Sequence, residues 1–231
     1  MNEVLRQERK FLISLEEMYR ESGLLSQVLM EDPHNRGDGY TIRSLYFDSL
    51  DDRDLQEKED GVELRRKIRL RCYDPRGDFA VLEMKQKQGA MQLKRSLRLT
   101  RGDAGRLTRG DYSPLTLYSD PFAAECYGVM RMLQYQPRAV IEYRRRAFMA
   151  RENKIRITFD HHITGTESCY DIFSPELLQS PLLNPCLVVL EVKYNGFLLS
   201  YIKDLLERHR GSELSVSKYA LGRAISKHVV F

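Results

Sequence analysis

Residues 67–72 read Lys-Ile-Arg-Leu-Arg-Cys, with a cation at every odd position and an uncharged, mostly apolar side chain at every even one. Side chains alternate between the two faces of a β-strand, so this pattern predicts a strand with one basic and one apolar face. The same alternation recurs in residues 6–13, 41–48, 79–87, 92–100, 139–146, 154–160 and 188–194. Arg95 alone interrupts it within 92–100. We therefore expect about eight strands.

Turn and helix signals lie between these segments. Asp-Pro-Arg-Gly at residues 74–77 and Lys-Gln-Gly-Ala at 87–90 each indicate a hairpin, so the sheet should be largely antiparallel. Ser14, followed three residues later by Glu17, is typical of a capping box at the start of a helix. Helical periodicity predicts helices at residues 14–30, 121–133, 195–209 and 217–227. Residues 48–60 are expected to be turn-rich or helical, and residues 164–186, with three prolines, to form a connection.

The basic residues are concentrated in one part of the chain. The 231 residues carry 37 Lys and Arg against 33 Asp and Glu, a net charge of +4, but residues 61–101 hold twelve basic and four acidic residues, a net 12 − 4 = +8. Like charges at two-residue spacing repel one another unless an anion lies between them. Single carboxylates recur among the cations, at Glu8, Glu83, Asp160 and Glu191.

A closed barrel would explain this distribution. If about eight strands closed with their apolar sides outward beneath helices, the lumen would be charged. Its natural occupant would be a polyanion, and a carboxylate or two could hold a divalent metal that bridges phosphate oxygens.

Several other classes of protein are not supported. The longest apolar run is about five residues, against the roughly 20 needed to cross a bilayer, and residues 1–20 lack the apolar region of a secretory signal. The four cysteines, at positions 72, 126, 169 and 186, are far apart, as is typical of thiols in a reducing compartment. A P-loop sequence is absent. We expect a cytoplasmic protein that forms one domain over residues 1–231.

Two short motifs allow a second interpretation. His161-His162 suggests zinc, but no other His or Cys stands at ligand spacing, so we expect surface residues at a strand end. Arg144-Arg145-Arg146 could bind nucleic acid, but no signature of a nucleic-acid-binding fold accompanies it. We therefore expect no nucleic-acid ligand.

Eight motifs follow one another along the chain: Arg-Gln-Glu-Arg-Lys-Phe (6–11), Ser-Leu-Tyr-Phe-Asp (44–48), Ile-Arg-Leu-Arg (68–71), Leu-Glu-Met-Lys (82–85), Tyr-Arg-Arg-Arg-Ala-Phe (143–148), Arg-Ile-Thr-Phe-Asp (156–160), Leu-Glu-Val-Lys (190–193) and Ser-Lys-Tyr (217–219). In this order they resemble the VTC-type polyphosphate polymerase domain of the triphosphate tunnel metalloenzymes, the CYTH-like superfamily. The resemblance implies an α+β, mainly β fold: an eight-stranded antiparallel closed β-barrel with helices packed outside and a C-terminal helix at the tunnel end.

The resemblance also assigns roles to individual residues. It implies that the catalytic residues are Lys10, Arg69, Arg71, Lys85, Arg145 and Arg156. Further phosphate contacts would come from Arg6, Lys67, Lys87, Lys94, Arg98, Lys193 and Lys218. Tyr143 would lie near the nucleotide, and Mn²⁺ or Mg²⁺ would be held by Glu191, Glu8 and Glu83.

The implied activity is metal-dependent phosphoryl transfer inside a basic tunnel, with polyphosphate made from ATP. Such chemistry needs positioning and charge neutralisation more than a protein nucleophile. Hydrolysis of tripolyphosphate or of a nucleoside or organic triphosphate is one alternative, and a non-catalytic polyphosphate-binding or sensing module is another. CYTH enzymes have Glu where Arg6 stands here, which favours the polymerase-like branch. Eukaryotic relatives add an SPX domain and membrane helices that are missing here, so a separate membrane protein is a further expected partner.

Overall fold

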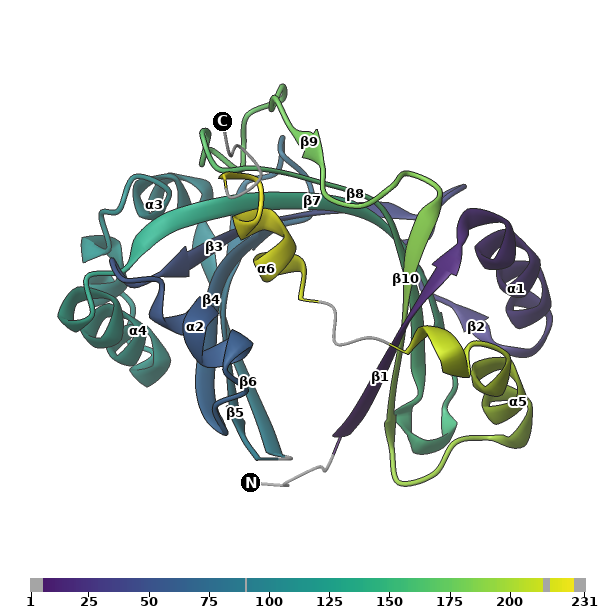
Figure 1. Ribbon diagram of the computed structural model, residues 1–231. Helices are drawn as coiled ribbons and strands as arrows, with labels where there is room; N and C mark the ends of the chain where they lie inside the picture. Colours follow the sequence, from purple (N-terminus) through teal and green to yellow (C-terminus); the bar gives the residue numbers. More distant parts are fainter. Residues whose placement is uncertain (1–5, 90, 214–216, 227–231) are drawn as a thin grey trace. The chain divides into compact units, whose positions relative to one another are not determined.

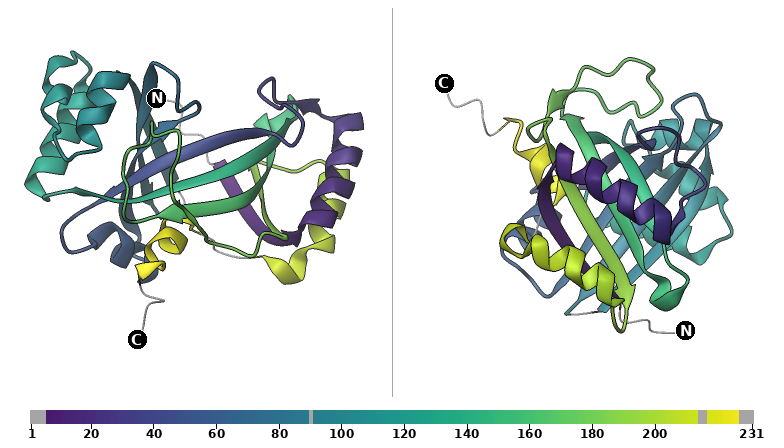
Figure 2. Two further views of the ribbon diagram at one scale, coloured as in Figure 1. Left: turned by 90° about the horizontal axis from the view of Figure 1, so that it is seen from above. Right: turned by 90° about the vertical axis from the view of Figure 1, so that its right-hand side faces the viewer.

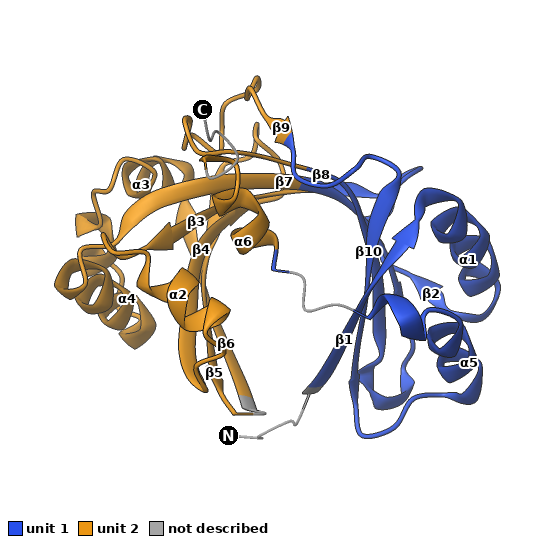
Figure 3. Ribbon diagram, viewed as in Figure 1, with its two compact units in different colours: residues 1–41, 143–163, 181–217 blue, residues 42–142, 164–180, 218–231 orange. Residues whose placement is uncertain are grey.

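The computed structural model describes residues 6–89, 91–213 and 217–226, except for the side chains of Arg6 and Met91. The chain forms two compact units, coloured separately in Figure 3. Unit 1 comprises residues 1–41, 143–163 and 181–217, and unit 2 comprises residues 42–142, 164–180 and 218–231. Three long strands contribute residues to both units: β3 (Tyr40–Asp48), β7 (Gln136–Met149) and β8 (Arg156–Thr166).

Unit 1 is a sheet covered on one face by two helices. Its strand order is β1 (Arg6–Ser14), β10 (Leu187–Asn195), β8 and β7, and the short β2 (Met30–Glu31) pairs with β7. Figure 2, right, shows α1 (Leu15–Val28) and α5 (Ser200–Arg208) over the same face of β1 and β10. Phe11, Phe159 and Leu190 of the sheet form one apolar cluster with Met18 and Leu205 of the helices. Two single turns of 3₁₀ helix lie at Glu152–Lys154 and Arg210–Ser212.

Unit 2 has the strand order β7, β3, β4 (Leu64–Cys72), β5 (Phe79–Gln88) and β6 (Met91–Thr100). In Figure 1, α3 (Arg101–Leu107) and α4 (Pro121–Met132) lie on one side of this sheet, and α6 (Lys218–Arg223) lies on the other. Leu82 and Leu99 of the sheet pack with Phe122 and Met130 of α4. The remaining elements are α2 (Arg53–Glu59), a 3₁₀ turn at Ser113–Leu117 and β9 (Ser180–Pro181), which pairs with β8.

The alternation of the sequence separates the two faces of these strands. Across β4 and β5, Leu70 lies opposite Leu82 on the apolar face, and Lys67 lies opposite Lys85 on the charged face. Arg95, which interrupts the alternation, lies opposite Met84 and binds Glu125 of α4 on the apolar side. The strand therefore keeps its alternation at Arg95, and the interruption is one charged residue on the apolar face.

The predicted strands are all present, and the antiparallel, mainly β character of the fold is confirmed. Ser14 caps α1, and Ser14 and Glu17 form the predicted capping box. The helix predicted at residues 195–209 begins later, at Ser200, and the one predicted at 217–227 ends at Arg223, although residue 227 lies outside the described part of the chain, as does Ala90 of the second hairpin.

Two features were predicted incorrectly or not at all. His161 was expected at the surface, but it is fully buried and its Nε2 contacts the Asp38 carbonyl oxygen. Helix α3 was not predicted, although Thr100 caps it by accepting a hydrogen bond from the Asp103 amide.

The strand orders end at β1 in unit 1 and at β6 in unit 2, and no pairing among the described strands closes them into a barrel. Closure and the single-domain assignment therefore stay predictions. Among the described residues, no helix has the length and apolar character that crossing a bilayer requires.

Candidate functional site

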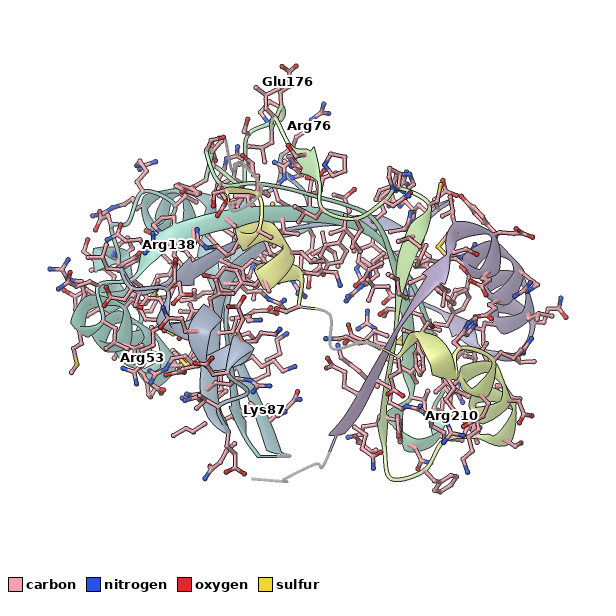
Figure 4. The ribbon with its side chains drawn as sticks, in the orientation of Figure 1. Arg53, Arg76, Lys87, Arg138, Glu176 and Arg210 are labelled. Carbon is pink, nitrogen blue, oxygen red and sulfur yellow. The ribbon has the colours of Figure 1, made fainter. Side chains whose placement is uncertain are left out.

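The face of β4, β5 and β6 that is turned away from the apolar cluster is strongly basic. Among the described residues of these strands, it carries one carboxylate, Glu83, and eight cations: Arg65, Lys67, Arg69, Arg71, Lys85, Lys87, Lys94 and Arg98. We call these nine residues the basic face; Lys87 is labelled in Figure 4. Because like charges repel across neighbouring strands, this excess of cations favours an anionic ligand.

Glu83 lies at the centre of the basic face and is only 3% exposed. Arg69 Nε donates to Glu83 Oε2 at 2.6 Å, Arg71 Nη2 lies 3.7 Å from the same oxygen, and Lys94 Nζ contacts Oε1. Burial alone would raise the pKa of Glu83, but the three cations lower it to about 2. Glu83 is therefore ionised at every pH at which the protein would work.

Two stacked tyrosines border the basic face. Arg69 Nη1 donates to Tyr46 Oη at 3.2 Å, and the Tyr46 ring stacks on Tyr219 of α6 with 5.2 Å between ring centroids. Burial opposes ionisation of Tyr46, but Arg69 and Lys67 lower its pKa to about 8. Tyr219 donates to Asp48 Oδ2 at 2.6 Å, which joins α6 to the end of β3. Lys218, a predicted phosphate contact, is the residue before Tyr219.

Two buried polar atoms on this side of the sheet have no hydrogen-bond partner. They are Arg71 Nε and Ser44 Oγ, and their residues lie directly opposite each other on β4 and β3. An unsatisfied buried polar atom costs about 1–3 kcal/mol. Both atoms are shielded from solvent, so an oxygen-rich anion would remove this cost only if the neighbouring side chains moved to admit it.

In unit 1, the corresponding face alternates between acidic and basic residues. Glu8 of β1 lies opposite Lys193 of β10, and Lys10 lies opposite Glu191. Lys10 Nζ is 2.8 Å from Glu8, and Lys193 Nζ contacts Glu191 and lies 3.9 Å from Glu8. Burial lowers the pKa of Lys193 on balance, whereas Glu191 and Glu8 outweigh burial and raise that of Lys10. The Lys193 ammonium group is thus shared by the two carboxylates.

Two predicted arginines of unit 1 have carboxylate partners of their own. Arg145 donates to both oxygens of Asp160, at 2.6 and 2.8 Å, and its guanidinium lies 5.4 Å from the centre of the Tyr143 ring. Arg156 Nη2 donates to Asp32 Oδ2 at 2.8 Å. The alternation within β8 had already placed Asp160 among the cations, but nothing in the sequence pointed to Asp32.

The structure gathers the predicted residues into two sets, one in each unit. Unit 1 contains Arg6, Glu8, Lys10, Tyr143, Arg145, Arg156, Glu191 and Lys193. Unit 2 contains Lys67, Arg69, Arg71, Glu83, Lys85, Lys87, Lys94, Arg98 and Lys218. Arg6 lies opposite Asn195 at the start of β1, but its side chain is outside the described part of the structure. Tyr46, Ser44 and Asp32 were not predicted to belong to either set.

The predicted metal ligands differ in how well they suit a divalent cation. Mg²⁺ and Mn²⁺ prefer carboxylate oxygens, and Glu8 and Glu191 lie beside two cations: Lys193, which they share, and Lys10, which is 2.8 Å from Glu8. Glu83 has three cations within ion-pair distance, which would repel a metal ion. Across the described residues, no group of three or more His, Cys, Asp and Glu is arranged to hold a metal. Glu8 and Glu191 therefore fit, provided that phosphate oxygens complete the coordination.

Comparison with known proteins identifies one family and several similar structures over most of the chain. The family model of the VTC domain matches residues 5–227. The structure is similar to that of a proposed adenylate cyclase from Bacillus halodurans, with a TM-score of 0.51 and 15% identity over 92% of this chain and 95% of that one. A proposed adenylate cyclase from Vibrio parahaemolyticus has a TM-score of 0.48 and 10% identity over 96% and 98% of the two chains. At such identity, the first similarity shows the fold alone. Comparison with curated proteins gave no match.

Proposed function

The chain belongs to the VTC domain family, and from this we propose that it transfers phosphoryl groups along triphosphate or polyphosphate chains and makes polyphosphate from ATP. The observation that carries the proposal is the basic face, where eight cations surround a single carboxylate. Such an excess suits a long polyanion better than a monoanion. Membership of the family alone would not distinguish a working phosphate site from a lost one, and the retained cations support a working one.

We assign phosphate binding to the basic face. Arg69 and Arg71 can each donate two parallel hydrogen bonds to a phosphate group. Arg71 Nε and Ser44 Oγ would gain their missing partners from the same anion if the neighbouring side chains moved to admit it. Lys85 and Lys94 lie opposite each other on β5 and β6, so they extend the track of positive charge.

In unit 1, Glu8 and Glu191 would hold Mg²⁺ or Mn²⁺, which when bound would neutralise charge on the bridging phosphate oxygens. Lys193 would then turn from the carboxylates toward the phosphate chain. Lys10, held by Glu8, and Arg145, held by Asp160, keep fixed positions for binding phosphate oxygens. Tyr143 would contact the nucleotide. Closure of the strands into a tunnel stays part of this proposal.

The test is to incubate the purified protein with ATP and Mn²⁺ and to resolve the products. Long phosphate chains together with ADP are the expected result. Free phosphate in place of chains would identify a hydrolase. No turnover together with tight polyphosphate binding would identify a binding module, and neither turnover nor binding would overturn the assignment to phosphate chains.

A further inference from the structure

We propose that Glu83 is a built-in counter-anion that competes with phosphate oxygens for Arg69, Arg71 and Lys94, and thereby limits the affinity of the basic face. This inference rests on the proposed function only in taking a phosphate chain as the ligand. It gives Glu83 a role that differs from metal binding.

The geometry around Glu83 is that of an anion-binding site that is already filled. Glu83 lies directly opposite Arg69 on β4 and opposite Ser96 on β6, so it occupies the middle strand of the basic face. Its Oε2 forms ion pairs with the Arg69 and Arg71 guanidinium groups, and its Oε1 forms an ion pair with the Lys94 ammonium group. A phosphate group would use the same donors in the same way.

The competition is present at all working pH values, because the pKa of Glu83 is about 2. The Glu83 carboxylate also stabilises the folded protein. Arg71 is almost completely buried, and without Glu83 its charge would have no carboxylate close to it among the described residues. A phosphate chain carries more charge and more oxygens than one carboxylate, so it can take over these donors. Each phosphate bound there must nevertheless displace or repel Glu83, which weakens binding and speeds release.

The test measures binding of inorganic tripolyphosphate by calorimetry in EDTA, so that no metal contributes. Glu83→Gln is expected to lower the Kd by about tenfold, because close charge pairs in interfaces couple by at least the free energy of one factor of ten. The melting temperature of the free variant should fall, and the rise in melting temperature on adding tripolyphosphate should exceed that of the wild type.

Glu125→Gln is the matched control. Glu125 pairs with Arg95 on the opposite face of the same strands, so this variant loses the same charge and also deprives an arginine of its carboxylate partner. Its Kd is expected to stay within about twofold of the wild-type value, because Glu125 is only half-buried and lies on the opposite face of the sheet, so that salt screens its charge from the ligand.

The outcomes separate the inference from the proposed function. If the wild type binds tripolyphosphate and Glu83→Gln binds it equally or more weakly, the inference is wrong and the proposed function stands. If the wild type does not bind, the proposed function fails and the inference fails with it. If Glu83→Gln does not fold, Glu83→Asp replaces it: the shorter carboxylate keeps the charge but loses reach, so the affinity should rise by about threefold, and an unchanged or lower affinity would count against the inference.

Discussion

Arg69, Arg145 and Arg156 each bind a carboxylate of their own unit: Glu83, Asp160 and Asp32 respectively. A guanidinium that is held in this way loses little freedom when a ligand arrives, so the binding residues are pre-organised. The same pairing means that each of these three arginines has two possible partners, a carboxylate of the protein and the phosphate ligand. Substitution of a carboxylate on these faces should therefore separate binding of the phosphate chain from turnover of the substrate.

Glu191→Gln is expected to lower metal-dependent turnover by at least about a hundredfold, because even residues that only support a metal ligand contribute roughly 10- to 100-fold. Tripolyphosphate binding in EDTA should be unchanged or slightly tighter, since the variant removes a negative charge. Steady-state rates with ATP and Mn²⁺, compared with calorimetry in EDTA, would show this separation.

Glu213→Gln is the control for this variant. Glu213 pairs with Arg9 and is exposed, so its loss changes the net charge equally but should leave turnover intact. Full activity of Glu191→Gln would show that the metal assignment is wrong.

At the scale of elements, the loop between β2 and β3 depends on one glycine. Gly39 has φ +112°, and a Cβ atom there would lie 2.2 Å from the Arg145 carbonyl oxygen of β7. The loop also carries Asp32, the partner of Arg156. Gly39 is therefore required both for its backbone conformation and for the close approach of the loop to β7.

Gly39→Ala should lower the free energy of unfolding by several times the roughly 1–2 kcal/mol of an ordinary left-handed alanine. Gly37→Ala supplies that ordinary case, because Gly37 has φ +54° and nothing within 4 Å of its added Cβ atom. Urea unfolding of the two variants measures the difference. Equal losses in both would mean that the contact between the loop and β7 is not formed.

Period-two alternation was enough to predict the strands and the sorting of charge, because one face of each strand must be apolar. The same alternation would have placed His161 correctly. His161 stands two and four residues after Phe159 and Ile157 and therefore lies on their buried face of the strand. Other features left no pattern in the sequence. Helix α3 contains Gly102 and Gly105, which weaken helix propensity.

Side-chain contacts between residues far apart in the chain could not be predicted from the sequence either. Arg156 and Asp32 are 124 positions apart, and no periodicity connects them. The stacking of Tyr46 on Tyr219 belongs to the same class, although both tyrosines lie in motifs that carried the family resemblance. The alternation thus predicted which face of each strand is apolar and which is charged, whereas the ion-pair partners of individual side chains could be identified only in the structure.

At the scale of the whole molecule, each unit is assembled from three separate stretches of chain, so neither can form before distant segments meet. In unit 2, one carboxylate connects three of the elements concerned. Asp48, at the end of β3, accepts hydrogen bonds from the backbone amides of Asp54 and Leu55 in α2 and from the hydroxyl of Tyr219 in α6. The stability of the unit should therefore respond to the charge around Asp48.

Asp54 makes this response depend on pH. Burial, and then the neighbouring Asp48, raise the pKa of Asp54 from 3.8 to about 7, despite the hydrogen bond that Tyr135 donates to it. The folded protein therefore holds a proton that the unfolded chain has lost. The free energy of unfolding should fall as pH rises between about 4 and about 7, by up to about 1.4 kcal/mol per pH unit.

Urea unfolding at a series of pH values measures this slope. Asp54→Asn imitates the protonated side chain and should flatten it. Glu83 does not interfere, because its lowered pKa affects stability only at pH values below about 4.5. An unchanged slope in Asp54→Asn would assign the pH dependence to other groups.

Arg95 gives β6 a single permitted alignment with its neighbours. Its guanidinium is received by Glu125 and Gln86 on the apolar side of the sheet. If β6 slipped by two residues during assembly, its leucines would return to the apolar side of the sheet, but Arg95 would move away from Glu125 and both charges would lose their partner. The leucines alone would accept a shift of two residues, whereas the ion pair between Arg95 and Glu125 accepts none, so this one charge selects the alignment of β6.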